Sequence, residues 1–200
     1  MSLALRFDIT GMALTVAFGG TAGSVPAAPS GEIEQLRRRD PEAWRIVFER
    51  EMPAIFSYAF SRTGKHGDAE DLAAQVFEHA WRAAPGLQDR GLPPRAWLFG
   101  IARNVVAEHR RGLFRRPPAL ELSAFDGDEP GVDHSTDQLE LARAIAALPR
   151  ADAEVVTLRF LHGLSVQETA EAMHTSLDGV KARQSRALKK LRGLLGEGAG

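Results

Sequence analysis

The side chains best placed for chemistry in this sequence are cations near its carboxyl end. They lie on a segment with helical spacing, in the order Lys181, Arg183, Arg186, Lys189, Lys190 and Arg192. A guanidinium can donate two hydrogen bonds to one guanine edge, whereas cations on phosphates add affinity without reading sequence. The pattern therefore indicates binding to duplex DNA, with a solvated basic helix in an ordinary bundle as the alternative.

Two predicted helices position these cations. Ser165 and Glu168 form a capping-box pattern, so a short helix should begin at Val166. Thr175 or Ser176 then caps a second helix, whose packing face is Val180, Ala187, Leu191 and Leu195. Two capped helices separated by so short a turn are typical of a helix-turn-helix, whose second helix enters the major groove.

Charge is distributed unevenly along the 200 residues, although the formal net charge is only −1. Residues 95–116 hold six arginines against one acidic residue, Glu108. Residues 117–141 hold seven acidic residues and no lysine or arginine, together with helix-breaking prolines and glycines. This pattern predicts two basic modules joined by a flexible acidic linker over 117–137.

A second group of polar side chains has the composition of a metal site. His66, Asp68, Glu70 and Asp71 are close in sequence, but Asp68 is better placed to cap a helix and His66 to lie in a turn. The chain has no cysteine, which excludes disulfides and thiolate metal sites and fits a reducing compartment such as the cytoplasm. We therefore expect no metal, no cofactor, no catalytic residue and no small-molecule substrate.

Helical periodicity extends through the rest of the chain, and no segment alternates as a half-buried strand would. Asp40 and Pro41 are typical of a helix start, and Pro53 should break or kink that helix. Further helices are predicted over 68–84, 95–111, 137–148 and 150–162. Residues 1–38 are expected to be a disordered extension and 196–200 a short tail. The predicted fold class is all-α.

Three motifs follow one another along the chain. They are DAEDLAAQVFEHAWR (68–82), RAWLFGIARNVVAEHRR (95–111), and the helix-turn-helix preceded by Leu148 and Pro149. In order and spacing they resemble a bacterial RNA polymerase sigma factor of the extracytoplasmic-function (ECF) group of the sigma-70 family. The likeness implies a region 2-like module over 39–116 that binds core polymerase and the minus-ten element. It also implies a region 4-like module over 138–195 that binds the minus-thirty-five element.

The resemblance implies roles for residues of the first module. Asp71, Gln75 and Glu78 would bind the clamp helices of the polymerase largest subunit, with three solvated polar residues as the alternative. The loop over 87–94 resembles one that captures a flipped promoter base, and Asn104 would complete its pocket. The minus-ten surface would comprise Leu87, Gln88, Asp89, Arg90, Arg103, Asn104, Arg110 and Arg111. Trp97 is expected in the core rather than stacked on DNA.

The resemblance also implies a minus-thirty-five surface. It would comprise Gly179, Lys181, Ala182, Arg183, Ser185, Arg186 and Lys189, with Arg186 able to hold a guanine edge. Three departures from the family pattern are Leu87-Gln88 where an aromatic residue is frequent, His174 where the turn usually has glycine, and Gln184 where an apolar residue is usual. The first departure leaves open which base is captured. The substitution at His174 predicts backbone strain in the turn between the two helices of the helix-turn-helix.

The implied partners are promoter DNA and core polymerase, contacted through its clamp helices and flap, with an anti-sigma factor as a further candidate. The rival interpretation is a conventional helix-turn-helix repressor or activator that never contacts polymerase. That rival predicts a dimerisation element and a palindromic operator. The sequence offers no evident dimer helix, and the rival leaves the first basic module without a role.

Overall fold

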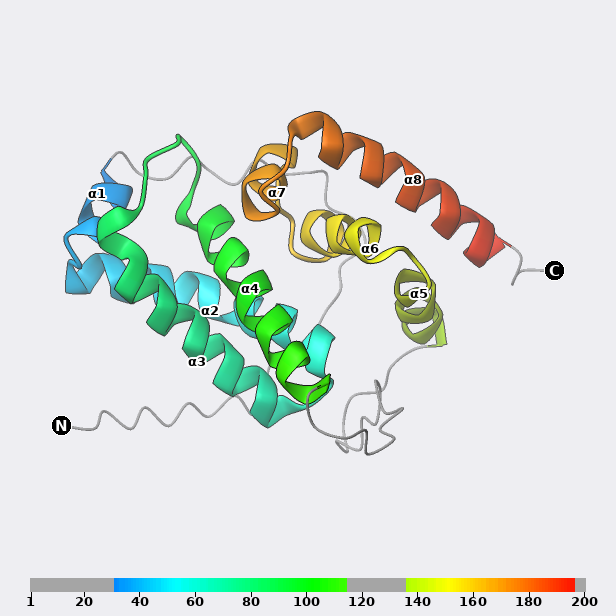
Figure 1. The fold of residues 1–200 in the computed structure, drawn as a ribbon, viewed down its shortest axis with the longest axis horizontal. Coiled ribbons are helices and arrows are strands. Elements are labelled where there is room, and N and C mark those ends of the chain that lie inside the picture. Colours follow the sequence, from blue (N-terminus) through cyan, green and yellow to red (C-terminus); the bar gives the residue numbers. More distant parts are fainter. Residues whose placement is uncertain (1–30, 115–135, 197–200) are drawn as a thin grey trace.

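The computed structural model describes residues 31–114 and 136–196, which form two helical modules (Figure 1). The first module contains α1 (Glu32–Arg37), α2 (Pro41–Thr63), α3 (His66–Ala83), the 3-10 turn η1 (Ala84–Gly86) and α4 (Pro94–Phe114). The second contains α5 (Thr136–Ala146), α6 (Arg150–Val156), the π-helical turn η2 (Thr157–Leu161), α7 (Val166–Ala172) and α8 (Leu177–Gly196). No strand occurs in these two ranges, which confirms the predicted all-α class.

The start of α2 follows the sequence prediction. The Asp40 carboxylate accepts a hydrogen bond from the backbone N–H of Ala43 at 2.9 Å, and proline occupies the first turn. Of the break or kink predicted at Pro53, the break does not occur, because the helix continues through it to Thr63. Pro53 removes one backbone donor, while Val47 and Ile55 on either side of it are buried in one core that holds both halves in place.

Helix α3 begins earlier than expected, at His66, so the prediction that Asp68 is the cap is wrong. The cap position is Lys65, and Asp68 lies in the first turn. There the positive end of the helix dipole stabilises its carboxylate. His66 Nδ1 lies 3.5 Å from Glu70 Oε1, and Asp68 Oδ2 lies 3.7 Å from His109 Nε2. Across the described part of the chain, no three such groups converge on a metal site.

Helix α1 was not expected, because it falls within the predicted disordered extension. Ile33 and Leu36 are nevertheless buried in the core of the first module. The Trp44 indole N–H donates to the Leu36 carbonyl at 3.1 Å, and Arg50 donates to the buried carboxylate of Glu32 at 2.9 Å. Tertiary contacts therefore hold this short helix. The rest of the extension (1–30) and residues 117–135 of the predicted linker lie outside the described residues, and residues 136–137 of that linker begin α5.

The two modules share one hydrophobic core. Leu158, Leu164 and Ala172 of the second module belong to the same buried cluster as Leu72 and Phe99 of the first. Helix α7 lies beside α4 of the first module. Helix α8 packs on α6, on the side that faces away from the first module (Figure 1). Among the described helices, none is long and apolar enough to cross a bilayer.

The corner between α7 and α8 has the predicted local chemistry. Ser165 Oγ accepts from the Glu168 N–H at 3.1 Å and the Glu168 carboxylate accepts from the Ser165 N–H at 2.7 Å, which confirms the capping box. Ser176 Oγ accepts from the Gly179 N–H at 3.0 Å at the start of α8. His174 adopts φ 49°, a left-handed conformation that is costly for a residue with a Cβ, as predicted for this corner.

Removing the first of these caps should destabilise the protein. Ser165→Ala deletes the acceptor for an N–H at the start of α7, so we expect the free energy of unfolding to fall by about 1 kcal/mol in urea titrations. Ser165→Asp retains a capping oxygen and should stay within about 0.5 kcal/mol of wild type. Equal losses in the two variants would show that the cap is not what stabilises this turn.

Candidate nucleic-acid interface

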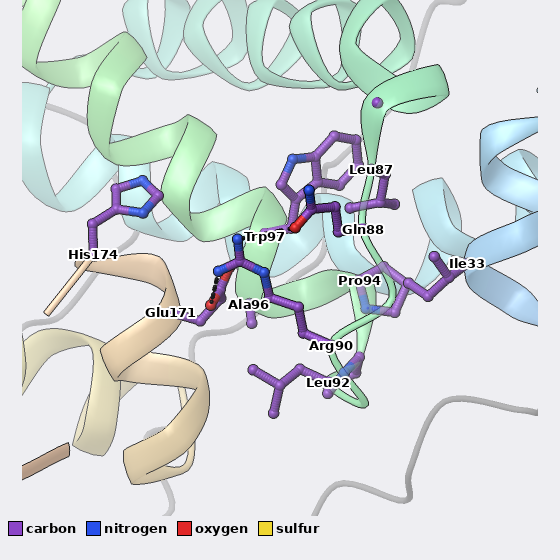
Figure 2. Close-up of a pocket in the computed structure, with 12 residues that line it drawn as sticks. Ile33, Leu87, Gln88, Arg90, Leu92, Pro94, Ala96, Trp97, Glu171 and His174 are labelled. Atoms are coloured by element: carbon purple, nitrogen blue, oxygen red, sulfur yellow. Dashed lines mark hydrogen bonds and ion pairs between the residues drawn. The ribbon is translucent and has the colours of Figure 1, made fainter. Parts of the chain in front are cut away.

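A pocket of about 310 Å³ opens between the loop that follows η1 and the first turn of α4 (Figure 2). The loop turns at Gly91, which has φ 67°, and the Asp89 carboxylate accepts from the Gly91 N–H at 2.9 Å. The walls come from both modules and include Leu87, Gln88, Arg90, Trp97, Glu171 and His174. Apolar walls with a few polar groups suit a flat ring that carries hydrogen-bonding edges.

Two apolar residues fix this loop to the module. Leu87 is buried in the shared core, so its side chain anchors the loop, whereas Gln88 and Asp89 are exposed. Trp97 packs against the same core, as expected from the sequence, but its indole is only half-buried and also lines the pocket (Figure 2). Trp97 is therefore available for stacking with a planar ligand as well.

The other residues of the predicted minus-ten surface lie along α4. Asn104, Arg110 and Arg111 are exposed. Asn104 lies seven residues after Trp97, two helical turns away, and is not among the residues that line the pocket. Arg103 differs from its neighbours because it is turned toward the second module, where it donates to Glu154 Oε1 at 3.2 Å and to the Ala172 carbonyl at 2.5 Å.

The predicted polymerase surface is a row on α3. Asp71, Gln75 and Glu78 are exposed at a spacing that places them on one side of the helix. The Glu78 carboxylate pairs with Arg82 one turn later. Since Leu72 and Val76 are buried against the core, the row faces outward.

The predicted minus-thirty-five residues on α8 do not all face solvent in the same way: four are exposed along one side, and Gly179 and Arg183 contact the start of the helix. Lys181, Ala182, Ser185 and Lys189 are exposed along one side of the helix. Gly179 instead packs on the cap, because an added Cβ would lie 2.9 Å from Thr175 Oγ1. Arg183 is also held locally, donating to the same Oγ1 at 3.2 Å.

Arg186 has an intermediate position at the edge of α8. Its Nη2 donates to Asp152 Oδ1 of α6 at 3.1 Å, yet 62% of the side chain is exposed. A guanidinium has five N–H donors. The pairing with the buried Asp152 therefore orients the group and leaves its remaining N–H donors available for DNA. Gln184, the departure from the apolar pattern, accepts from Arg159 Nε at 3.1 Å, which explains a polar residue there.

A polar cluster between the modules was missed by the sequence analysis. The Glu154 carboxylate of α6 accepts from the Tyr58 hydroxyl at 2.7 Å and from Arg62 at 2.8 Å, in addition to Arg103. Burial and the negative charge of Glu154 raise the pKa of Tyr58. The one sequence signal was a carboxylate placed within the apolar run from Ala153 to Val156. A second pairing lies nearby, where Arg90 Nη1 donates to both oxygens of Glu171 at 3.0 Å.

His162 is buried beside this cluster. Its ring packs edge-on against Tyr58 with centroids 5.6 Å apart and lies 5.2 Å from Phe99. Burial, followed by the positive charges of Arg95 and Arg62, lowers the pKa of His162 to about 3. The folded protein therefore holds this imidazole neutral throughout the physiological range.

The buried imidazole should make stability depend on pH. An unfolded histidine has a pKa of about 6.5, so below that pH the unfolded chain binds a proton that the folded chain does not. Stability should fall as pH drops from 6.5 toward 5, by up to about 1.4 kcal/mol per pH unit from this residue. His162→Gln should reduce that slope in urea titrations, whereas His79→Gln on exposed α3 should leave it unchanged. An undiminished slope in His162→Gln would rule out this assignment.

Comparisons with known families match both modules. Residues 47–116 match the family model described as Sigma-70 region 2, and residues 138–191 match Sigma-70, region 4. The chain is 31% identical over 173 residues to the ECF RNA polymerase sigma factor BldN of Streptomyces coelicolor, covering 84% of this chain but only 66% of BldN. It is 34% identical over 163 residues to the ECF RNA polymerase sigma factor SigD of Mycobacterium bovis, covering 76% of this chain and 77% of SigD.

Solved structures give the same fold. CnrH in complex with the cytosolic domain of CnrY matches with a TM-score of 0.62 and 27% identity, covering 83% of this chain and 96% of CnrH. The sigma factor RpoE in complex with the anti-sigma factor NepR, from Bartonella quintana, matches with a TM-score of 0.59 and 27% identity, covering 76% and 95% of the two chains.

Proposed function

Because the chain belongs to the ECF group of RNA polymerase sigma factors, we propose that it binds core polymerase through α3 and reads promoters with one surface on each module. The features that carry this proposal are a pocket of about 310 Å³, lined mostly by the first module and partly by Glu171 and His174, and a helix-turn-helix in the second module. A repressor needs only the second feature. The two together suit a protein that recognises duplex DNA and then holds separated strands.

The first module would hold core polymerase and the melted strand. Asp71, Gln75 and Glu78 form an exposed, mainly acidic row for the clamp helices. The pocket beside Gln88 and Trp97 would accept an extruded base, because unstacking a base costs a few kcal/mol that stacking and hydrogen bonds must offset. The cations of this surface, Arg90, Arg103, Arg110 and Arg111, would contact phosphates.

The second module would recruit polymerase to the minus-thirty-five element. Lys181 and Lys189 supply positive charge on the exposed side of α8, with Ala182 and Ser185 between them near base edges. Arg186, oriented by Asp152, is the candidate for a guanine edge. The exposed Phe160 and Leu161 of η2 offer an apolar contact for the polymerase flap.

We place this activity in the cytoplasm, with no catalytic role. The bound anti-sigma factor of the RpoE structure makes a regulator of that kind a candidate partner here. Residues 117–137 would serve as the linker between the two DNA-reading surfaces, as their acidic composition suggests.

A mobility-shift assay with purified components tests the proposal. The chain alone should leave duplex promoter fragments unshifted at concentrations at which chain plus core polymerase shifts them. Tight binding of the chain alone to a palindromic site, unaffected by core polymerase, would favour the repressor interpretation instead.

A further inference from the structure

The corner between α1 and α2 holds a residue in an unfavourable backbone conformation. Arg39 has φ 57°, in the left-handed region. Its N–H donates to the Leu36 carbonyl at 3.0 Å, and the Asp40 N–H donates to the Gln35 carbonyl at 3.0 Å. This pair of hydrogen bonds is a Schellman motif, which normally has glycine at the position of Arg39. A side chain there is costly, so a compensating contact of that side chain is expected.

The Arg39 side chain contacts the end of α3. Its Nε donates to the Trp81 carbonyl at 3.2 Å and its Nη2 to the Arg82 carbonyl at 3.4 Å, while the guanidinium carbon lies 5.7 Å from the centroid of the Trp81 ring. In a continuous helix the Trp81 carbonyl would accept from residue 85, but that residue is proline and has no N–H. Arg39 supplies the missing donor, and the negative end of the helix dipole stabilises its charge.

This end of α3 is where the pocket loop begins. The turn η1 follows α3 directly, and the loop over 87–93 leaves η1 and returns at Pro94, the first residue of α4. Ala84 is fully buried, and its carbonyl accepts from the Leu87 N–H at 3.0 Å. A change in the last turn of α3 would therefore move Leu87 and the loop that it anchors.

Helix α1 holds the corner against the pocket. Ile33 is buried in the core of the first module and lines the pocket on the side opposite Glu171 (Figure 2). Glu32, also buried, accepts from Arg50 of α2 at 2.9 Å. The helix packs on η1 as well. Arg39 therefore follows an element that is itself fixed to the pocket.

We propose that Arg39 is a positioning residue of the base pocket, because it fixes the helix end from which the pocket loop departs. The inference rests on the proposed function for the nature of the ligand, an extruded promoter base. The contacts of Arg39 join elements of the first module alone, so they do not depend on where the second module lies. Without them the last turn of α3 loosens, and the loop holds a base less firmly and with less selectivity.

The variant Arg39→Gly separates positioning from stability. Glycine adopts the left-handed conformation without strain, so the relief of strain should offset the lost hydrogen bonds and leave the free energy of unfolding in urea nearly unchanged. The Leu87 N–H should nevertheless exchange with solvent about threefold faster by NMR, a modest effect because the lost contacts are exposed. The Gly64 N–H, which donates to the Phe60 carbonyl at the end of α2, should keep its rate.

The matched control is Arg38→Ala at the neighbouring exposed position. Arg38 pairs with Glu34 at 2.8 Å within α1, so its loss should leave the exchange of the Leu87 N–H unchanged. Unchanged Leu87 exchange in Arg39→Gly would overturn the proposal. Equal acceleration in the two variants would overturn it as well, because the effect would then belong to α1 in general.

Base capture is measured with core polymerase. Arg39→Gly should bind duplex promoter fragments normally but give about threefold less open complex, as reported by permanganate reactivity of unpaired thymines. Pre-melted templates in which one unpaired minus-ten base at a time is replaced measure base preference. The variant should discriminate about threefold less at the position that the pocket reads, because a looser loop fits the bases more equally. A residue that served stability alone would leave this preference unchanged.

The exchange measurement needs neither polymerase nor DNA, so it decides whether Arg39 holds the loop, whatever the loop binds. Promoter-dependent transcription by the unsubstituted chain tests the proposed function separately. Faster Leu87 exchange with unchanged strand opening and unchanged base preference, in a chain that supports transcription, would overturn this inference and leave the proposed function in place.

Discussion

Reversing the charge of the α3 row should weaken core polymerase binding by at least about tenfold. Asp71→Lys and Glu78→Lys together replace two exposed anions with cations, and like charges placed across an interface cost several kcal/mol. Fluorescence anisotropy of the labelled chain with core enzyme measures the effect. The fold should survive, because both side chains are exposed.

Glu49→Lys on the exposed side of α2 is the matched control and should bind core enzyme normally. If the double reversal on α3 also bound normally, this row would not be the polymerase surface. Asp71, Gln75 and Glu78 would then be ordinary solvated residues, the alternative to a polymerase-binding surface that the sequence left open.

The second large effect concerns strand separation. Asn104 lies on α4 beyond the pocket, so its exposed amide could hold an unpaired strand only along that helix. Asn104→Ala should leave recruitment to duplex promoter nearly unchanged but lower the yield of open complex by about tenfold, as for one or two lost hydrogen bonds to that strand. Permanganate reactivity of unpaired thymines reports the opening. Lys181→Ala with Lys189→Ala should show the opposite pattern, with weaker recruitment and a reduced salt dependence of binding.

A template with a pre-melted bubble provides the control for Asn104. The defect should shrink there, because the cost of separating the strands has already been removed. Equal losses of duplex binding in the Asn104 and lysine variants, with no opening defect, would describe a simple duplex-binding protein.

Local signals in the sequence predicted much of this fold. The caps at Asp40, Ser165 and Ser176 depend on residues within three positions of one another, so their chemistry is visible in the chain itself. The exposed row on α3 and the cationic side of α8 follow from helical periodicity for the same reason. The left-handed corner at His174 was also predicted, from its place in the turn.

The contacts between modules could not be predicted in this way. Tyr58 and Glu154 are 96 residues apart in sequence, and Arg90 and Glu171 are 81 apart. No local pattern states which arginine a distant carboxylate will hold. Helix α1 escaped prediction for a related reason, because burial of Ile33 and Leu36 against other helices, rather than a cap, stabilises it.

Arg103 shows the consequence of these distant contacts for function. Sequence reasoning placed it with Arg110 and Arg111 on a DNA surface, and the structure places its guanidinium against Glu154 and the Ala172 carbonyl. The two placements differ because Glu154 lies 51 residues beyond Arg103 in sequence, so no local pattern shows the pairing.

The most direct measurement of the central claim is transcription in vitro with core polymerase on genomic fragments, with start sites mapped. Adding the chain should yield transcripts from discrete starts that share two upstream elements. Core enzyme alone should yield none of them, and the Asp71→Lys, Glu78→Lys variant should lose them. Identical transcripts with and without the chain, despite binding of the chain to those fragments, would contradict its assignment as a promoter-specificity factor.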